Sequence, residues 1–167
     1  MEATFQLHNM CLEVVERVVN DDVLLTLFDI PEALWPAIKK SWREKRTDFM
    51  GRFDLAWNGV DPPKLFEYNA DTPSVLIESA LTQLHWQNEK HPKHWQSNFV
   101  ISSLVSSLKK LDRKYKFASN DKFLGIGTIK GDEEAEATSD FIKKIAERLN
   151  IPVVVGDISK LQTSYSW

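Results

Sequence analysis

Two short runs of alternating residues, separated by a cluster of turn formers, limit the folds open to this chain more than any other feature. The first run is FMGRFDLAW at 49–57 and the second is KLFEYNAD at 64–71. Between them, residues 58–63 read NGVDPP, a composition typical of turns. A period of two is typical of β-strands, so these residues predict an antiparallel β-hairpin with a longer loop.

Centring the loop on residues 58–63 determines which hairpin residues face one another. Asp54 then lies opposite Glu67, and Arg52 lies opposite Asn69. Because successive strand residues point to opposite faces, these four side chains share one polar face. The other face is expected to pack on the core and carries five apolar or aromatic residues: Phe53, Leu55, Trp57, Phe66 and Tyr68.

The polar face has two chemical interpretations. Cross-strand neighbours lie roughly 5 Å apart at Cβ, so Asp54 and Glu67 are close enough to share a divalent cation beside the amide of Asn69. Such oxygen donors suit Mg²⁺, and Arg52 is placed to hold an anionic phosphoryl or acyl-phosphate group. Alternatively, the same residues form salt bridges on an ordinary solvated face, and a register slip of one residue would reverse the faces.

The rest of the chain alternates between helical and strand patterns. Helical spacing predicts five helices, at 4–20, 23–28, 31–46, 74–89 and 97–116. The last third predicts a strand at 123–129, an amphipathic helix at 132–149 and a strand at 152–155, which implies a parallel crossover. We therefore expect an α/β fold in one compact domain, with a helical N-terminal segment at 1–48 and an α/β part at 49–167.

A polar junction follows the second strand of the hairpin, where residues 69–74 read NADTPS. Thr72 or Ser74 could cap the following helix and leave its free N–H groups directed at an anion. An ordinary capped turn explains the same residues, so both interpretations stay open.

The segment GIGTIKG at 125–131 has the order of a dinucleotide-binding fingerprint: strand, glycines, helix, strand and a terminal acid, Asp157. Three features argue against that function. Lys130 stands where a glycine or alanine allows close helix packing, and Thr128 continues the strand pattern. The acidic residues at 132–134 would face a pyrophosphate at the helix N-terminus.

Composition argues against several classes of protein. Lys and Arg number 21 and Asp and Glu number 24, so a polybasic nucleic-acid binder is not expected. No apolar run reaches the ~18 residues that a membrane-spanning helix needs. A single cysteine, Cys11, excludes an internal disulfide, and we expect a cytoplasmic protein. The histidines form no convincing metal motif, because Pro92 interrupts the pair His91 and His94.

The residues GRFD at 51–54 and EYNADTPS at 67–74, together with the helix LHNMCLEVVERVVND at 7–21, resemble the glutathionylspermidine synthase family. The likeness covers most of the chain and is strongest to the shorter, synthetase-only members described as acid–amine ligases. It implies a domain like the pre-ATP-grasp part of an ATP-dependent ligase. In that family, a carboxylate of glutathione is phosphorylated by ATP and an amine of spermidine then attacks the acyl phosphate.

The resemblance implies roles for residues of the hairpin. Asp54, Glu67 and Asn69 would be Mg²⁺ ligands, with Mg²⁺ bridging the phosphates of ATP. Arg52 would stabilise the transferring phosphoryl group and would be the catalytic residue of this part of the chain.

It also implies substrate-binding residues. Ser74 and Thr72 would lie on the glutathione side, and Glu133 and Glu134 would match an acidic pair that contacts the peptide substrate. The family's ATP-grasp part, with its ATP-binding lysines, continues beyond the region equivalent to residue 157. We therefore expect this chain to be the N-terminal pre-ATP-grasp portion of such a ligase, and to be inactive as a ligase by itself.

A different class of function remains open. A non-catalytic α/β binding or interaction module could keep the same hairpin without using ATP. In either case, a domain separated from its usual neighbour exposes apolar surface, so self-association is expected.

Overall fold

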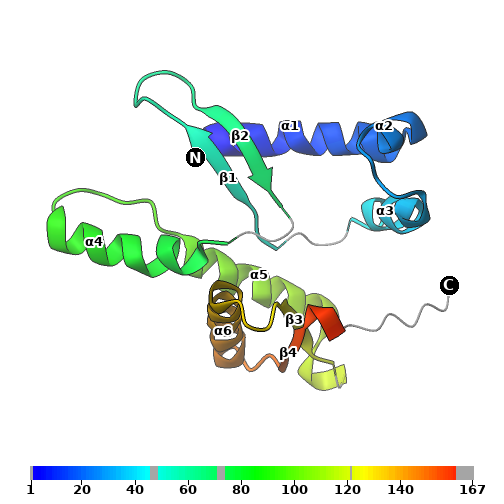
Figure 1. Cartoon of the computed structure of the whole chain (residues 1–167). Coiled ribbons are helices and arrows are strands. Elements are labelled where there is room, and N and C mark those ends of the chain that lie inside the picture. The colour runs from blue at the N-terminus through cyan, green and yellow to red at the C-terminus, as the bar shows by residue number, and fades with distance from the viewer. Residues whose placement is uncertain (1, 46–48, 71–73, 121, 161–167) are drawn as a thin grey trace. The chain divides into compact units, whose positions relative to one another are not determined.

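Elements of both helix and strand occur in the computed structural model, which describes residues 2–45, 49–70, 74–120 and 122–160. Two compact units, Met1–Asp71 and Thr72–Trp167, divide the chain. The first unit contains α1 (Glu2–Val19), α2 (Asp22–Leu27), η1 (Glu32–Leu34), α3 (Trp35–Arg43), β1 (Arg52–Ala56) and β2 (Lys64–Asn69) (Figure 1). The second contains η2 (Glu78–Thr82), α4 (Gln83–Lys90), α5 (Val100–Tyr115), η3 (Ala118–Asn120), β3 (Leu124–Thr128), α6 (Glu133–Arg148), β4 (Val153–Asp157) and η4 (Ile158–Lys160). The expected α/β class is confirmed.

The hairpin of β1 and β2 belongs to the first unit, together with the N-terminal helices. The sequence placed its division between residues 48 and 49, before the hairpin, whereas the compact units divide after it. Within this unit α1 contacts the hairpin directly, because Nδ1 of His8 and the hydroxyl of Tyr68 are hydrogen-bonded at 3.0 Å. The division into 1–48 and 49–167 as parts of one domain stays a prediction.

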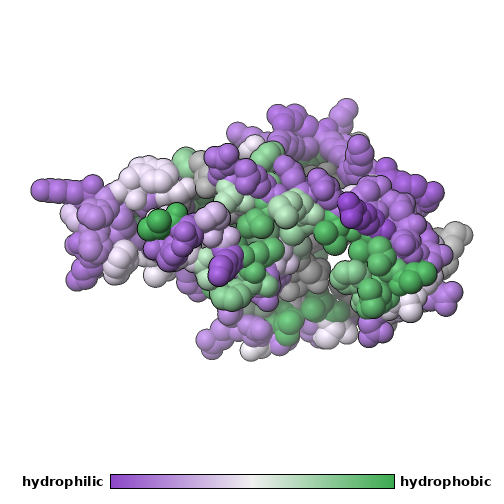
Figure 2. Space-filling view, turned by 90° about the horizontal axis from the view of Figure 1, so that it is seen from above, coloured by the Kyte–Doolittle hydropathy of each residue, from purple (hydrophilic) through white to green (hydrophobic). Residues whose placement is uncertain are grey.

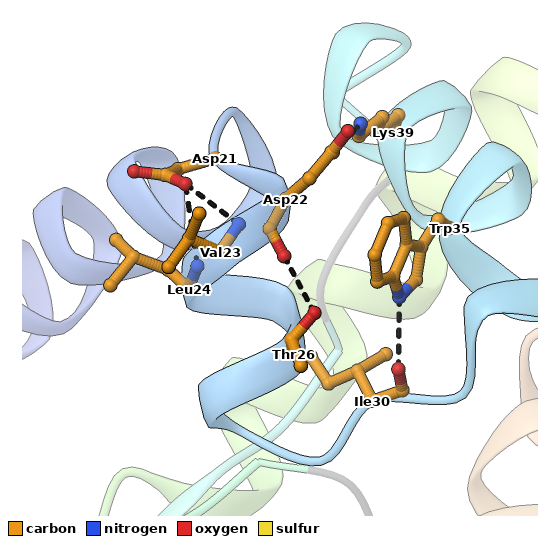
Figure 3. A network of polar contacts seen from close by, with 8 residues as sticks. All are labelled: Asp21, Asp22, Val23, Leu24, Thr26, Ile30, Trp35 and Lys39. Carbon is orange, nitrogen blue, oxygen red and sulfur yellow. Dashed lines mark hydrogen bonds and ion pairs between the residues drawn. The ribbon is translucent and has the colours of Figure 1, made fainter.

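Asp21 sets the start of α2. Its Oδ1 accepts hydrogen bonds from the backbone N–H groups of Val23 at 2.8 Å and Leu24 at 3.3 Å. These donors have no partner within the helix, so the carboxylate satisfies them (Figure 3). Leu25 of the capped helix is fully buried, at 0% exposure.

Side-chain bonds connect α2 to α3. The indole Nε1 of Trp35 donates to the carbonyl of Ile30 at 2.9 Å, and Lys39 of α3 forms an ion pair with Asp22 (Figure 3). Pro36 lies in the first turn of α3, where its missing N–H costs no helical hydrogen bond. The predicted helix at 31–46 is therefore a short 3₁₀ turn, η1, followed by α3.

The register of the hairpin agrees with the one expected from the sequence. Arg52 pairs with Asn69, Phe53 with Tyr68, and Asp54 with Glu67. The register then shifts by one residue after Asp54. Because Leu55 pairs with Leu65, Phe66 is an extra residue of β2, and the shift is a β-bulge.

One expectation for the hairpin is wrong. Trp57 and Phe66 do not pack on the core, since they are 68% and 77% exposed. Phe66 is the unpaired residue of the bulge, and Trp57 lies beyond the end of β1, where its Nε1 donates to the carbonyl of Asp61 at 2.8 Å. The other three residues of the apolar face, Phe53, Leu55 and Tyr68, are half-buried.

The second unit is built around a parallel strand pair. β3 and β4 run parallel from Leu124 opposite Val153 to Thr128 opposite Asp157, and α6 connects them and packs on both. The core of this unit lies under α5 and α6 and includes Leu104, Leu108, Phe117, Ile145, Ala146 and Ile151. The predicted strand–helix–strand unit is confirmed.

A wide turn interrupts the predicted helix at 74–89. Residues Glu78–Thr82 form a π-helical turn, η2, before α4 begins. The side-chain amide of Asn98 donates to the carbonyl of Ala80 at 2.9 Å. This bond gives a partner to a backbone group within the π-helical turn.

Apolar side chains also lie at the surface. Figure 2 shows green patches among the purple hydrophilic side chains, and the exposed residues include Phe5, Met10, Val23, Leu27 and Phe28 of the first unit. In the part of the chain that the structure describes, no helix is both long and apolar enough to cross a bilayer.

Removing the cap of α2 tests this description of the first unit. We expect Asp21→Ala to lower the free energy of unfolding by about 1 kcal/mol, because two helix donors lose their acceptor. Urea denaturation followed by circular dichroism measures the change. Asp21→Ser keeps an acceptor and should retain most of the stability; equal losses in the two variants would contradict a capping role.

Candidate functional site

An ion-paired cluster occupies the polar face of the hairpin. Arg52 donates from Nε to Oδ1 of Asp54 at 2.8 Å and from Nη2 to Oδ2 of Asp54 at 3.2 Å. The same Nη2 lies 3.4 Å from Oε1 of Glu67. One guanidinium therefore bonds both carboxylates, and the two-pronged contact with Asp54 is the stronger.

The cluster is open to water on one side. The side chains of Arg52, Asp54 and Glu67 are 26%, 42% and 58% exposed. The hydrogen bond from Arg52 is the largest cause that lowers the pKa of Asp54, and partial desolvation opposes it. The bond to Asp54 likewise raises the pKa of Arg52. Asp54 is therefore a carboxylate, and Arg52 a guanidinium, throughout the neutral range.

The oxygen atoms on this face are of the kinds that hold a partly hydrated divalent cation. Asp54 and Glu67 face each other directly in the register, and Asn69 lies on the same face opposite Arg52. Carboxylate and amide oxygens are hard ligands, and Mg²⁺ commonly binds to one or two carboxylates with waters and phosphates completing its shell. No group of three or more His, Cys, Asp or Glu that could hold a metal occurs within the described ranges. A cation here would therefore need water or substrate oxygens as well.

The predicted substrate residues belong to the second unit. Thr72 lies outside the described residues, and Ser74 is half-buried just before the helical turn that starts at Leu76. Val75, between Ser74 and this helical turn, has a φ of +58°, a conformation that a β-branched residue rarely adopts. Such strain is common near functional sites, and no sequence pattern signalled it.

Glu133 and Glu134 lie in the first turn of α6 and are exposed. Asp132, which precedes them, caps the helix by accepting from the N–H of Ala135 at 3.0 Å. Two carboxylates in the first turn complement the positive end of the helix dipole. Within the described part of the chain neither glutamate forms a salt bridge, so both carboxylates are accessible to a cationic group.

The segment at 125–131 does not form a phosphate-binding turn. Gly125 and Gly127 lie inside β3, paired with Val154 and Gly156, so that they are not in the loop before α6. At the carboxyl ends of β3 and β4 there is an open crevice of about 350 Å³ along α6. Its charged lining residues are Lys130, Glu136, Asp140, Lys143 and Asp157. Three of these five charged residues are acidic, so the crevice is a poor match for the negative charge of a pyrophosphate.

Two other features of the sequence are the pair of His91 and His94, and the acid Asp157 at the end of β4. His91 and His94 approach each other, with ring centroids 5.4 Å apart, but no third ligand joins them among the described residues. Asp157 is held locally, because its Oδ1 accepts from the hydroxyl of Ser159 at 2.7 Å and from its N–H at 3.0 Å. The hydroxyl bond is the largest cause that lowers the pKa of Asp157.

Comparison with known proteins places this geometry in a family context. The family described as glutathionylspermidine synthase preATP-grasp matches residues 1–166. A trypanothione synthetase from Crithidia fasciculata is 45% identical over 82 residues, which cover 48% of this chain and 13% of that protein. A bifunctional glutathionylspermidine synthetase/amidase from Escherichia coli K12 is 39% identical over 92 residues, covering 53% of this chain and 14% of that protein.

The chain thus spans about one seventh of the length of these two relatives, and both are synthetases by name. The match of the family extends over almost every residue, which agrees with the resemblance over most of the chain that the sequence motifs indicate. On this evidence the chain belongs to the glutathionylspermidine synthase pre-ATP-grasp family.

Proposed function

We propose that this chain supplies the cation- and phosphate-facing hairpin of an ATP-dependent carboxylate–amine ligase. The observation that carries the proposal is the pairing of Asp54 directly opposite Glu67, with Arg52 bonded to both. Two like charges on facing strand positions destabilise a hairpin by themselves. A cation bound between the two carboxylates would offset this repulsion.

The reaction we propose has two steps. A carboxylate oxygen of the acid attacks the γ-phosphorus of ATP, and ADP leaves with the bonding electron pair, which produces an acyl phosphate. The amine nitrogen then attacks the acyl carbon, so that a C–N bond forms and the C–O bond to phosphate breaks. Phosphate leaves with the electron pair, and the amine nitrogen loses a proton.

The residues of the hairpin would bind and orient the phosphates in this scheme. Asp54, Glu67 and Asn69 would hold Mg²⁺, which when bound neutralises phosphate charge. Arg52 presents a planar set of N–H donors that matches the oxygens of a transferring phosphoryl group. A guanidinium placed beside two carboxylates is therefore suited to receive the anion once a cation has taken over those carboxylates.

The substrates that we propose are inferred from the family and from two exposed glutamates of α6. The name of the Escherichia coli relative contains glutathionylspermidine, and we propose an acid such as glutathione and a polyamine such as spermidine for this chain. Thr72 and Ser74 would contact the acid substrate. Glu133 and Glu134 offer two exposed carboxylates that suit the ammonium group of a peptide substrate. A cytoplasmic location and self-association also stay predictions.

Binding of Mn²⁺, a Mg²⁺ substitute visible by electron paramagnetic resonance, tests the cation site. We expect Asp54→Asn and Glu67→Gln each to weaken Mn²⁺ binding by at least roughly tenfold, because each removes a ligand charge. The matched control is Asp61→Asn, which changes an acid of the same hairpin that bonds Asn58 in the loop. If all three variants bind Mn²⁺ as the wild type does, the non-catalytic binding module becomes the better interpretation.

The lowered pKa of Asp54 predicts how its contribution to stability depends on pH. A carboxyl whose pKa is lower in the folded chain than its ordinary value of 3.8 stabilises the fold above that value. The contribution is lost as the pH falls through the lower, folded pKa. We therefore expect the stability difference between wild type and Asp54→Asn to be full at neutral pH and to shrink in acid.

Urea denaturation at neutral pH and at several acid pH values measures this difference. In an Arg52→Gln background the Asp54→Asn substitution should show a much weaker pH dependence, because the hydrogen bond that lowers the pKa is gone. An equal pH dependence in both backgrounds would show that Arg52 is not its cause.

A further inference from the structure

A side-chain contact joins α1 to the back of the cation site. Nδ1 of His8 and the hydroxyl oxygen of Tyr68 lie 3.0 Å apart in a part-buried hydrogen bond. The two rings meet edge to face, with centroids 5.9 Å apart and an interplanar angle of 77°. His8 thus connects a long helix to strand β2 at one defined position.

The contact continues across the hairpin to β1. Tyr68 pairs with Phe53 in the register, and their rings are stacked with centroids 4.0 Å apart. The ring of Tyr68 also lies over Gly51, where a Cβ atom would come within 2.6 Å of its Cε2. Because Gly51 has no side chain, the ring can lie close to the backbone of the chain just before β1.

The stacked pair lies directly behind the charged cluster. Tyr68 stands between Glu67 and Asn69 in β2, and Phe53 stands between Arg52 and Asp54 in β1. Alternation along a strand directs neighbouring side chains to opposite faces, so the aromatic pair fixes both strands from the face away from the carboxylates.

On its other side, the cation site borders the bulge. The regular ladder includes the pairs from Arg52–Asn69 to Asp54–Glu67, and the register shifts immediately after Asp54. Beyond the shift, Leu65 and Phe66 of β2 are exposed, so packing does not hold that end of the strand. The position of Glu67 relative to Asp54 therefore depends on the anchored end of the hairpin.

We propose that His8 and Tyr68 are positioning residues that hold Glu67 opposite Asp54 for cation binding. The inference rests on the proposed function, because it assumes that this pair of carboxylates binds a cation. Neither residue needs to touch the cation. The hydrogen bond to α1 restrains the strand that carries Glu67 and Asn69, and so keeps the donor oxygens within reach of one ion.

The test uses Tyr68→Phe, His8→Ala and the double variant in the full 167-residue chain. Tyr68→Phe keeps the ring and its stack on Phe53 but removes the hydroxyl. We expect each single variant to weaken Mn²⁺ binding by about three- to tenfold, less than the 10- to 100-fold typical of groups that bond a ligand directly. The double variant should bind Mn²⁺ as tightly as the single variant with the lower Mn²⁺ affinity. Both substitutions remove the same hydrogen bond, so their effects should not add.

Trp35→Phe is the matched control. It removes a part-buried side-chain hydrogen bond of the same unit, from Nε1 of Trp35 to the carbonyl of Ile30 at 2.9 Å. It should lower the urea midpoint without changing the Mn²⁺ dissociation constant of the folded protein. A role of Tyr68 in stability alone would produce the same result as this control.

Each outcome then decides one question. Weaker Mn²⁺ binding in Tyr68→Phe and His8→Ala, with binding unchanged in Trp35→Phe, supports the positioning role. If the wild type binds Mn²⁺ and both positioning variants bind it equally well, the inference is wrong and the cation site stands. If the wild type binds no Mn²⁺, the proposed cation site fails, and the positioning role fails with it.

Discussion

Two carboxylates placed directly across from each other on neighbouring strands are the constraint on which the polar face of the hairpin depends. Asp54 and Glu67 carry like charges on facing strand positions, an arrangement that by itself destabilises strand pairing. Arg52 offsets it by bonding both groups, although the residue directly opposite Arg52 is the uncharged Asn69. A hairpin face arranged for stability alone would place opposite charges in facing positions. The observed order instead concentrates negative charge at the position that we propose for a cation.

The hairpin also shows which structural features the sequence predicts and which it does not. The register of Asp54 opposite Glu67 follows from the alternation and from the position of the turn residues, so the polar cluster was predictable. The bulge was not, because an extra residue in β2 leaves the alternating pattern before Phe66 unchanged. For the same reason Trp57 and Phe66 were expected in the core, although the loop and the bulge leave both in water.

In the second unit the sequence was informative about elements and less so about backbone detail. The apolar strand patterns and the acidic start of α6 predicted the parallel unit, since these signals are local. The π-helical turn is contacted by Asn98, whose amide donates to Ala80 from a distant part of the chain, and neither this turn nor the positive φ of Val75 has a local sequence signal. Glycines at 125 and 127 occupy a strand, because paired backbone and not a tight turn determines their position.

The two ends of the hairpin differ in what holds them, and this difference bears on how the site can respond to a ligand. Near Asp54 and Glu67, one end is packed against α1 through His8 and Tyr68, and the other end begins with a bulge and exposed side chains. A rigid end preserves the spacing of the carboxylates, which a cation requires. A bulged end lets the strands and the loop at 58–63 adjust without breaking the regular pairs. Ligand-induced movement should therefore be confined to the loop side of Asp54, while the pairs from Arg52–Asn69 to Asp54–Glu67 keep their register.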